Sequence, residues 1–509
     1  MAGDTEGTIP DLLRRGSAEA PAILAPGRPP LTFGGLRAMI PSVAGALRAH
    51  GIDPEDRVAI VLPNGPEAAT AFLALACAAA TAPLNPAYRE EELDFYLDDL
   101  KAKAVLVTAE EEGPAVTVAR RRGMRLLRLS VPEGAEAGRF GLGEAEPVEP
   151  APRPEATALL LHTSGTTSRP KLVPLSHANL VASARHIGAT LALRPQDRCL
   201  NIMPLFHIHG LVAAVLASLA AGGSVFCTPG FNALRFFAWL EEAGPSWYTA
   251  VPTMHQAILA RAERNPEALA RAELRLIRSS SASLPPQVMR ALEATFRCPV
   301  IESYGMTEAA HQMTSNPLPP AVRKPGSVGL PAGPLVRIAD PLAPVLRGPG
   351  ETGEVVISGP NVTRGYEANP EANAKAFFEA EGRRWFRTGD EGVFDAEGYL
   401  RLTGRLKEII NRGGEKVSPL EVDEVLMDHP AVAQCVTFAI PHEKLGEEVG
   451  AAVVLKEGAS ASEQEIRAFA ATRLADFKVP RRVVILPEIP KGATGKLQRI
   501  GLAQRLGLA

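Results

Sequence analysis

The pattern of apolar and polar positions alternates between short strand-like runs and longer helix-like segments through the first three hundred residues. In a first block, apolar runs at 57–62 and 104–108 flank a helical pattern that begins near Glu67, which is the rhythm of a βαβ unit. A second block gives strand candidates at 158–162, 224–227, 247–251, 276–279 and 300–303, with helical stretches between them. This pattern predicts stacked, mainly parallel sheets with flanking helices.

The pattern of apolar and polar residues changes toward the C-terminus. From about Gly326, short alternating runs are split by Gly and Pro, as in GEVVISGP and GYLRLTGR, which predicts a β-rich subdomain over about 326–406. The last hundred or so residues contain the strand-like runs VAQCVTFAI and GAAVVL, an amphipathic helix from Ser462 and a tail with PKGATGK. We therefore expect an α/β fold with a large N-terminal domain, residues 1–406, and a small mobile α+β C-terminal domain, residues 407–509.

Composition narrows the class of protein. The 509 residues are 46% hydrophobic and 22% charged, which is typical of globular proteins and excludes both global disorder and a lone small binding module. Lys plus Arg number 54 against 57 Asp plus Glu, so the net charge of −3 provides no basic field, and we expect no nucleic-acid partner. An uncharged stretch between Arg198 and Arg235 is broken by Pro and Gly, so it fits a buried helix followed by a strand, and we expect no membrane insertion.

Cysteines and termini bear on the compartment. Five cysteines lie scattered without a CxxC pair, mostly inside apolar runs, which predicts reduced core thiols. The N-terminus has no basic segment followed by an apolar one, and the C-terminal Gly-Leu-Ala is not a peroxisomal address. We expect a cytoplasmic protein, whose oligomeric state the sequence leaves open because no heptad pattern stands out.

A loop of small and hydroxylated residues is the strongest chemical signal. In LLLHTSGTTSRPK, residues 159–171, an apolar strand runs directly into this loop, which ends at Lys171. Glycine lets backbone N–H groups approach phosphate oxygens, hydroxyls add donors and the lysine adds positive charge, so the loop suits a polyphosphate. The spacing is not that of a Walker A loop, and the composition alone is equally that of a flexible surface turn.

Five further motifs follow this loop in a fixed order: PLFHIHGL at 204–211, YGMTEA at 304–309, FRTGD at 386–390, GRLKEIINRGGEKVSP at 404–419 and PKGATGK at 490–496. With them the sequence resembles, over essentially its whole length, the adenylate-forming enzymes that include acyl-CoA synthetases, peptide-synthetase adenylation domains and beetle luciferases. The departure is Ser168, where most members of the family have Gly.

The resemblance implies two half-reactions, with ATP and CoA as co-substrates and Mg²⁺ as cofactor. A carboxylate attacks the α-phosphate of ATP to give an acyl-adenylate and pyrophosphate, and a thiol then displaces AMP. The carboxylate is already ionised at neutral pH, so catalysis must come from positioning and from neutralising phosphate charge.

The resemblance also assigns roles to residues. The phosphate loop would grip the β- and γ-phosphates, Tyr304 would stack on adenine, Thr307 would touch the α-phosphate, and Glu308 would hold Mg²⁺. Asp390 would accept the ribose hydroxyls, and Arg405 would contact the ribose or the α-phosphate, although alone they read as a turn residue and a surface residue. The full set implied for ATP is Thr163, Ser164, Gly165, Thr166, Thr167, Lys171, Ser303, Tyr304, Thr307, Asp390 and Arg405.

The C-terminal segment carries the remaining implied roles. Lys496 would bridge the attacking carboxylate and the α-phosphate, so that Lys496, Thr307 and Glu308 form the catalytic set, although an isolated tail lysine is usually solvated surface. Lys407 matches the family's hinge, about which the loop 411–416 would replace Lys496 for thioester formation. Gly413 and Gly414 are candidates for close approach by CoA and are equally a hairpin turn.

The segments implied for the acyl pocket indicate a small acid. They bring in His207, His209, Ser281 and His311 where a fatty-acid enzyme would have small and apolar residues, although each histidine taken singly reads as a satisfied buried group. The stretches SWYTAVPTMHQAIL, RSSSASLPP and YGMTEAAHQMTSNPLPPAVRKPGSVG, together with Ser168, resemble the oxalate-CoA ligase branch of the family. On that resemblance His311 and Ser281, with His207 nearby, would fix the distal carboxylate of oxalate.

Three other functions stay open from the sequence. The first is a short-chain, medium-chain or aryl acyl-CoA synthetase, and the second is an adenylation enzyme that loads a carrier-protein thiol. The third is a non-catalytic nucleotide sensor, which the presence of Lys496, Glu308 and Asp390 disfavours.

Overall fold

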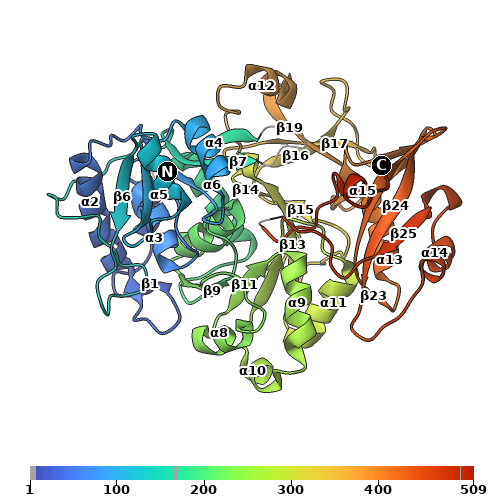
Figure 1. Cartoon of the computed structure of the whole chain (residues 1–509), viewed down its shortest axis with the longest axis horizontal. Coiled ribbons are helices and arrows are strands. Elements are labelled where there is room, and N and C mark those ends of the chain that lie inside the picture. The colour runs from blue at the N-terminus through green and yellow to red at the C-terminus, as the bar shows by residue number, and fades with distance from the viewer. Residues whose placement is uncertain (1–6, 164–169, 493) are drawn as a thin grey trace.

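The computed structural model describes residues 7–163, 170–492 and 494–509. Two large sheets occupy the greater part of the molecule, and a smaller, strand-rich part formed by the C-terminal residues lies at one end (Figure 1). The fold class predicted from the sequence is confirmed, with a large N-terminal and a small C-terminal part. The domain boundary at Lys407 and the β-rich subdomain over about 326–406 stay predictions.

The first predicted block forms a six-stranded sheet in the order β6-β5-β3-β4-β7-β8. Its strands are parallel except for the β7–β8 pair, whose antiparallel register sets Thr163 opposite Lys171 across the phosphate-loop motif. The bounds are β3 (Arg57–Ile60), β4 (Ala80–Pro83), β5 (Ala104–Thr108), β6 (Arg125–Leu129), β7 (Thr157–Thr163) and β8 (Lys171–Ser176).

The second block forms a nine-stranded sheet in the order β15-β14-β13-β12-β11-β9-β10-β1-β2, parallel from β13 to β1. Its bounds are β1 (Pro21–Leu24), β2 (Leu31–Thr32), β9 (Arg198–Asn201), β10 (Ser224–Cys227), β11 (Trp247–Ala250), β12 (Leu276–Ser279), β13 (Val300–Met306), β14 (His311–Ser315) and β15 (Leu330–Pro331). The strands β1 and β2 lack a recognisable pattern in the sequence, because they are only four and two residues long.

Helices cover these sheets and begin at recognisable caps. Ser176 caps α6 with a reciprocal bond from its third residue, Asn179, and Thr32 caps α2. The bounds are α1 (Ile9–Leu13), α2 (Phe33–Ala49), α3 (Pro66–Ala76), α4 (Glu90–Leu100), α5 (Pro114–Arg121), α6 (His177–Thr190), the π-helix η1 (His209–Leu216), α7 (Ala217–Ala220), α8 (Phe236–Ala243), α9 (Pro252–Ala262), α10 (Pro266–Arg271), α11 (Pro286–Phe296) and the 3₁₀ turn η2 (Thr307–Ala309).

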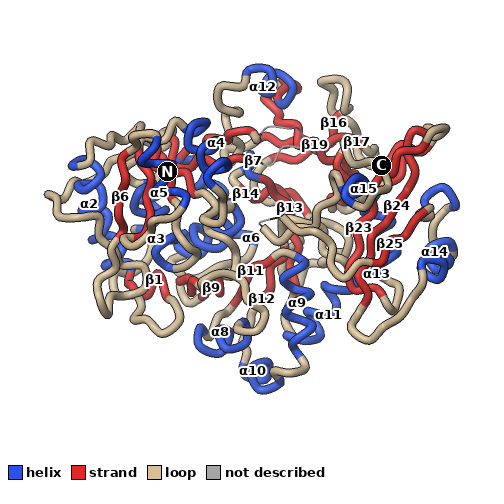
Figure 2. The backbone as a smooth tube through the Cα atoms, in the orientation of Figure 1, coloured by secondary structure: helices blue, strands red, loops and turns tan. Residues whose placement is uncertain are grey.

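The remaining residues form two smaller sheets, visible as the strand-rich upper right of the molecule (Figure 2). The antiparallel sheet β16-β17-β19-β18, with β20 on β19, has bounds β16 (Leu335–Ala339), β17 (Gly353–Ser358), β18 (Phe377–Ala380), β19 (Arg383–Phe394), β20 (Leu400–Arg405) and one helix, α12 (Pro370–Ala376). The last sheet, β22-β21-β24-β23 with β25 on β24, has bounds β21 (Ile410–Arg412), β22 (Glu415–Val417), β23 (Val432–His442), β24 (Gly446–Leu455), β25 (Arg482–Ile485), with α13 (Pro419–Met427), α14 (Glu463–Ala471), η3 (Asp476–Lys478) and α15 (Leu502–Arg505).

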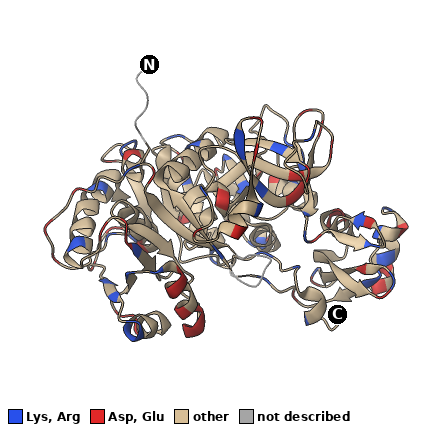
Figure 3. Ribbon diagram, turned by 90° about the horizontal axis from the view of Figure 1, so that it is seen from above, with Lys and Arg blue, Asp and Glu red and all other residues tan. Residues whose placement is uncertain are grey.

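Two simpler expectations, for the start of the C-terminal amphipathic helix and for the cysteines, are borne out by the same description. Ser462 caps α14 at the position predicted for the amphipathic helix, and all five cysteines are free and buried. Within the described ranges no helix has the length and apolarity needed to cross a membrane. Acidic and basic side chains are interspersed over both the large and the small part (Figure 3).

Candidate functional site

The C-terminal tail returns to the large part of the molecule and brings Lys496 with it (Figure 1). The hydroxyl of Thr253, at the start of α9, donates to the carbonyl of Gly495 at 2.6 Å. Gly495 has a φ of +80° and packs beside Val251 and Met254, so the segment turns tightly against α9. Lys496 is partly buried there, and burial together with Arg405 lowers the pKa of its ammonium to about 8, while Asp390 opposes the shift.

Asp390 links two elements that the sequence keeps 86 residues apart. Its carboxylate accepts a hydrogen bond from the Tyr304 hydroxyl, which comes from β13. Arg405 lies directly opposite Asp390 in the β19–β20 register, with its Nε 3.3 Å from the carboxylate. Burial raises the pKa of Asp390, and Arg405, Tyr304 and Lys496 oppose that rise.

A second carboxylate, Glu308, lies in the η2 turn after β13 and is buried. The Tyr366 hydroxyl donates to it at 2.9 Å, and the Lys171 ammonium stands 4.5 Å from the centre of the Tyr366 ring. Burial raises the pKa of Glu308, while Tyr366, Arg405 and Lys171 lower it. Tyr366 was missed from the sequence, because a tyrosine in GYEANP has no signal that separates it from a packing aromatic.

The structure thus brings together four of the residues implied for the nucleotide, along with Glu308 and Lys496. Hydrogen bonds, an ion pair or direct electrostatic effects connect Lys171, Tyr304, Glu308, Asp390, Arg405 and Lys496. Thr307 opens η2 beside Glu308, the Thr163 hydroxyl donates to the Lys171 carbonyl at 3.5 Å, and the Ser303 hydroxyl donates to the Ser279 carbonyl at 3.4 Å. Ser164, Gly165, Thr166 and Thr167 lie outside the described residues.

The candidates for hinge and CoA lie in the chain that follows Arg405. Lys407 is exposed in the turn between β20 and β21, where the amides of Glu408 and Ile409 both donate to the carbonyl of Arg405. Gly413 and Gly414, with φ of +59° and +99°, form the two-residue turn of the β21–β22 hairpin. This geometry agrees with a hairpin turn. The amide of Gly413 also donates to the Leu445 carbonyl at 2.8 Å.

The predicted acyl-pocket residues form one group, in which His209 and His311 are buried and His207 and Ser281 are half-buried. His209, at the start of the π-helix η1, lies 3.0 Å from the Ser281 hydroxyl through Nδ1 and 2.6 Å from the Thr249 hydroxyl through Nε2. Its ring centre is 5.0 Å from that of His311, and its backbone amide donates to Nδ1 of His207 at 3.2 Å. A π-helix at this point is typical of functional sites.

The pocket is uncharged at its histidines. Burial, with a smaller effect of Lys496, lowers the pKa of His207 to about 3. Burial also holds the pKa values of His209 and His311 well below their ordinary value, and Arg278 adds to this in both. These imidazoles therefore act as neutral hydrogen-bonding groups, and their neutrality was not foreseen from the sequence.

The backbone around the pocket is strained. Ser281 and His311 adopt φ of +73° and +102°, a region that residues with a Cβ rarely occupy except where a functional arrangement holds them. Gly305 makes room for this arrangement, since a Cβ on it would lie 1.8 Å from the His311 carbonyl oxygen. The glycine of YGMTEA is thus required by close approach of backbone.

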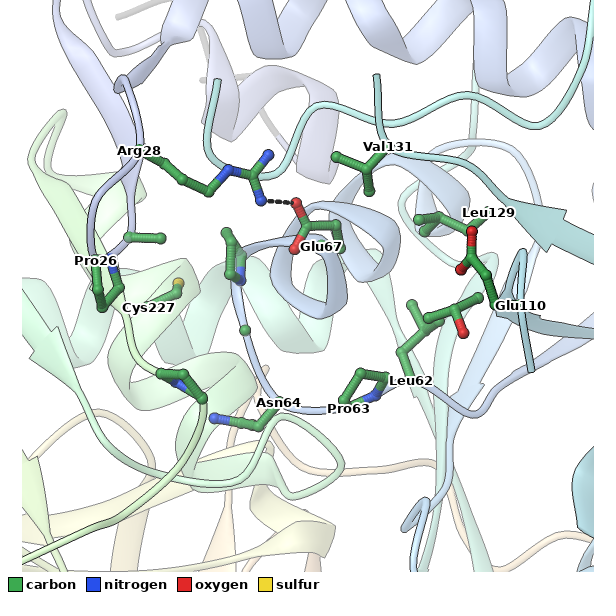
Figure 4. A pocket seen from close by; sticks show the side chains of 15 residues that line it. Pro26, Arg28, Leu62, Pro63, Asn64, Glu67, Glu110, Leu129, Val131 and Cys227 are labelled. Carbon is green, nitrogen blue, oxygen red and sulfur yellow. Dashed lines mark hydrogen bonds and ion pairs between the residues drawn. The ribbon is translucent and has the colours of Figure 1, made fainter. Parts of the chain in front are cut away.

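A separate hollow of about 360 Å³ lies at the carboxyl ends of β3 and β5, and no residue implied for the site lines it. Figure 4 shows Arg28 reaching across it to Glu67, with Asn64 on its floor. Asn64 accepts from the Leu205 amide at 2.7 Å and donates to the Thr228 carbonyl at 3.1 Å. Asn64 therefore supports the loop that carries His207.

Comparison with known proteins agrees with this geometry. Residues 14–367 match the model of the AMP-binding enzyme family, and residues 421–496 match the AMP-binding enzyme C-terminal domain. The chain belongs to the AMP-binding enzyme family. This confirms the resemblance drawn from the motifs and makes the chain an AMP-forming acyl-CoA ligase.

Relatives of this AMP-binding enzyme match it from end to end. It is 44% identical to an oxalate–CoA ligase of Arabidopsis thaliana over 99% of both chains, and 42% identical to an oxalate–CoA ligase of Saccharomyces cerevisiae over 88% of this chain and 87% of the other. Among solved structures, ATP-bound MatB from Rhodopseudomonas palustris matches with a TM-score of 0.89 and 30% identity, over 98% of this chain and 99% of that one.

Proposed function

We propose that this acyl-CoA ligase activates oxalate, converting it with ATP and CoA into oxalyl-CoA, AMP and pyrophosphate. The observation that carries the proposal is the polar group of His207, His209 and His311, which feels the charge of Lys496 and stands where a long acyl chain would need apolar walls. The similarity to two oxalate–CoA ligases supports the same acid.

In the first half-reaction a carboxylate oxygen of oxalate attacks the α-phosphorus, and the bond from that phosphorus to the pyrophosphate oxygen breaks. Lys496 carries the positive charge that holds carboxylate and α-phosphate together, because its ammonium lies beside Asp390 and Arg405 at the end of the tail. Asp390 accepts the ribose hydroxyls, Tyr304 contacts the adenine, and Lys171, Thr307 and Arg405 neutralise or orient the phosphates.

Mg²⁺ fits the residues present. Glu308 supplies one hard oxygen ligand, and no group of three potential metal ligands occurs in the part of the chain that the structure describes, so the ion would arrive on the phosphates of ATP. When bound, it would neutralise phosphate charge.

In the second half-reaction the CoA thiol attacks the oxalyl carbonyl carbon, and AMP leaves. We propose that residues 407–509 turn about Lys407 between the two steps, so that the β21–β22 hairpin with Gly413 and Gly414 replaces Lys496 beside the acyl group. The exposed turn at Lys407 supports this motion.

The test is pyrophosphate release by the purified protein with ATP, Mg²⁺ and CoA, comparing oxalate with acetate, malonate, octanoate and coumarate. We expect a kcat/KM for oxalate at least tenfold above that for any other acid. A preference for one of the others would keep the ligase class and refute oxalate. Formation of acyl-CoA without added carrier protein would exclude a carrier-loading enzyme.

A further inference from the structure

Arg278 is a fully buried arginine in the middle of β12, between β11 and β13 (Figure 2). In the sheet register it lies beside Thr249 and Ile301. Thr249 is the residue whose hydroxyl contacts His209, so Arg278 enters the same buried group from the strand. Arginine is almost never fully buried unless it is paired, which makes its surroundings informative.

Among the described residues, one of the three nitrogens of this guanidinium has hydrogen-bond partners. Nη2 lies 3.4 Å from His311 Nδ1 and 3.4 Å from Gln312 Oε1. Nε and Nη1 are buried without a hydrogen-bond partner among the described residues, and no carboxylate of that part of the chain forms an ion pair with Arg278. Burial accordingly lowers the pKa of Arg278 to about 9, and the nearby thiol of Cys199 opposes that shift.

An unpaired buried charge costs folding free energy, so its retention needs a compensating role. The neighbouring His209 and His311 cannot neutralise it, because an imidazole is either neutral or positively charged, and Arg278 itself disfavours their charged forms. Arg278 and Lys496 both act electrostatically on these two histidines, from β12 and from the tail respectively. A pocket of neutral imidazoles therefore has one cation on the strand and one on the tail, which suits a short acid with a negative charge at each end.

We propose that Arg278 is the specificity-determining residue of the acyl pocket, whose guanidinium, with unpartnered N–H groups at Nε and Nη1, pairs with the carboxylate of the acid that does not react. The inference rests on the proposed function and refines it, since the distal carboxylate is recognised by a buried cation rather than by the histidines alone. His311 then orients both the guanidinium and the acid, and Lys496 acts on the carboxylate that becomes the acyl-adenylate.

The test compares oxalate with oxamate, in which a neutral amide replaces one carboxylate, in the pyrophosphate-release assay. We expect Arg278→Met to lower kcat/KM for oxalate about 100-fold, the effect of losing hydrogen bonds to a charged group, and to change kcat/KM for oxamate less than threefold. Arg278→Lys, which keeps the positive charge but replaces the planar guanidinium by an ammonium, should retain part of the preference for oxalate.

Arg275→Met is the matched control, because Arg275 precedes the same strand but is already paired with Asp197 at 2.9 Å. It should leave the oxalate-to-oxamate ratio unchanged while lowering the melting temperature, since Asp197 loses its partner. Arg278→Met should leave the melting temperature unchanged or raise it, because no buried carboxylate is left behind.

The outcomes separate the two proposals. If wild type uses oxalate but Arg278→Met lowers kcat/KM equally for oxalate and oxamate, or for neither, then Arg278 does not bind the distal carboxylate. The proposed function stands in that case. If Arg278→Met does not fold, an oxalate-to-oxamate ratio in Arg278→Lys equal to that of wild type overturns the inference. If wild type does not use oxalate at all, the proposed function falls and this inference falls with it.

Discussion

Raising the pH should switch off adenylation through Lys496. Burial and the neighbouring Arg405 lower the pKa of this lysine to about 8, and only its protonated form can bridge a carboxylate and a phosphate. About 90% of the free enzyme is then protonated at pH 7 and about 10% at pH 9. The kcat/KM for adenylation should therefore fall about tenfold for each pH unit above 8, with no loss as the pH falls from 8 to 7.

The assay is exchange of labelled pyrophosphate into ATP with oxalate and without CoA, so that the CoA thiol contributes no titration. Because kcat/KM reports the free enzyme, its midpoint should lie near 8, whereas kcat should have a higher midpoint, since the bound triphosphate favours the charged lysine. Lys496→Arg, whose charge does not titrate, is the control and should have a flat profile. A wild-type kcat/KM that is flat to pH 10, or that rises with pH, would refute the assignment of Lys496.

Three further substitutions test other parts of the site. His311→Ala should raise the KM for oxalate about 10- to 100-fold and the KM for ATP less than threefold, and unchanged oxalate kinetics would remove His311 from the site. Asp390→Asn should raise the KM for ATP by a similar factor, because it removes the charge opposite Arg405, and an unchanged nucleotide KM would contradict the ribose assignment. Gly305→Ala should lower the free energy of unfolding by about 1–3 kcal/mol in urea titration, since its Cβ would overlap the His311 carbonyl, and a stability equal to wild type would show that the strand moves freely.

Short strands and a helix start show how closely sequence can predict local structure. The apolar runs at 224–227 and 276–279 coincide with β10 and β12, and Ser462 caps the helix at its predicted start. These features depend on local chemistry: alternation of side chains along a strand, and a hydroxyl that accepts the first free amides of a helix. The ordered motifs added the enzyme family and the residues proposed for the nucleotide for the same reason, since each motif is a contiguous stretch of chain.

The acid pocket was decided by tertiary structure. Arg278 is one polar residue of RSSSASL in the sequence. Only the pairing of β12 with β11 and β13, and the approach of His311 from β14, bury its guanidinium where no described carboxylate pairs with it. The neutrality of the histidines, the contact of Tyr366 with Glu308 and the joining of β1 to a sheet built from residues two hundred positions later are of the same kind. Sequence by itself determined which elements form and which chemistry they carry, whereas burial and the absence of a countercharge are properties of packing between distant segments, and these set the pKa values and the charge that the pocket offers its acid.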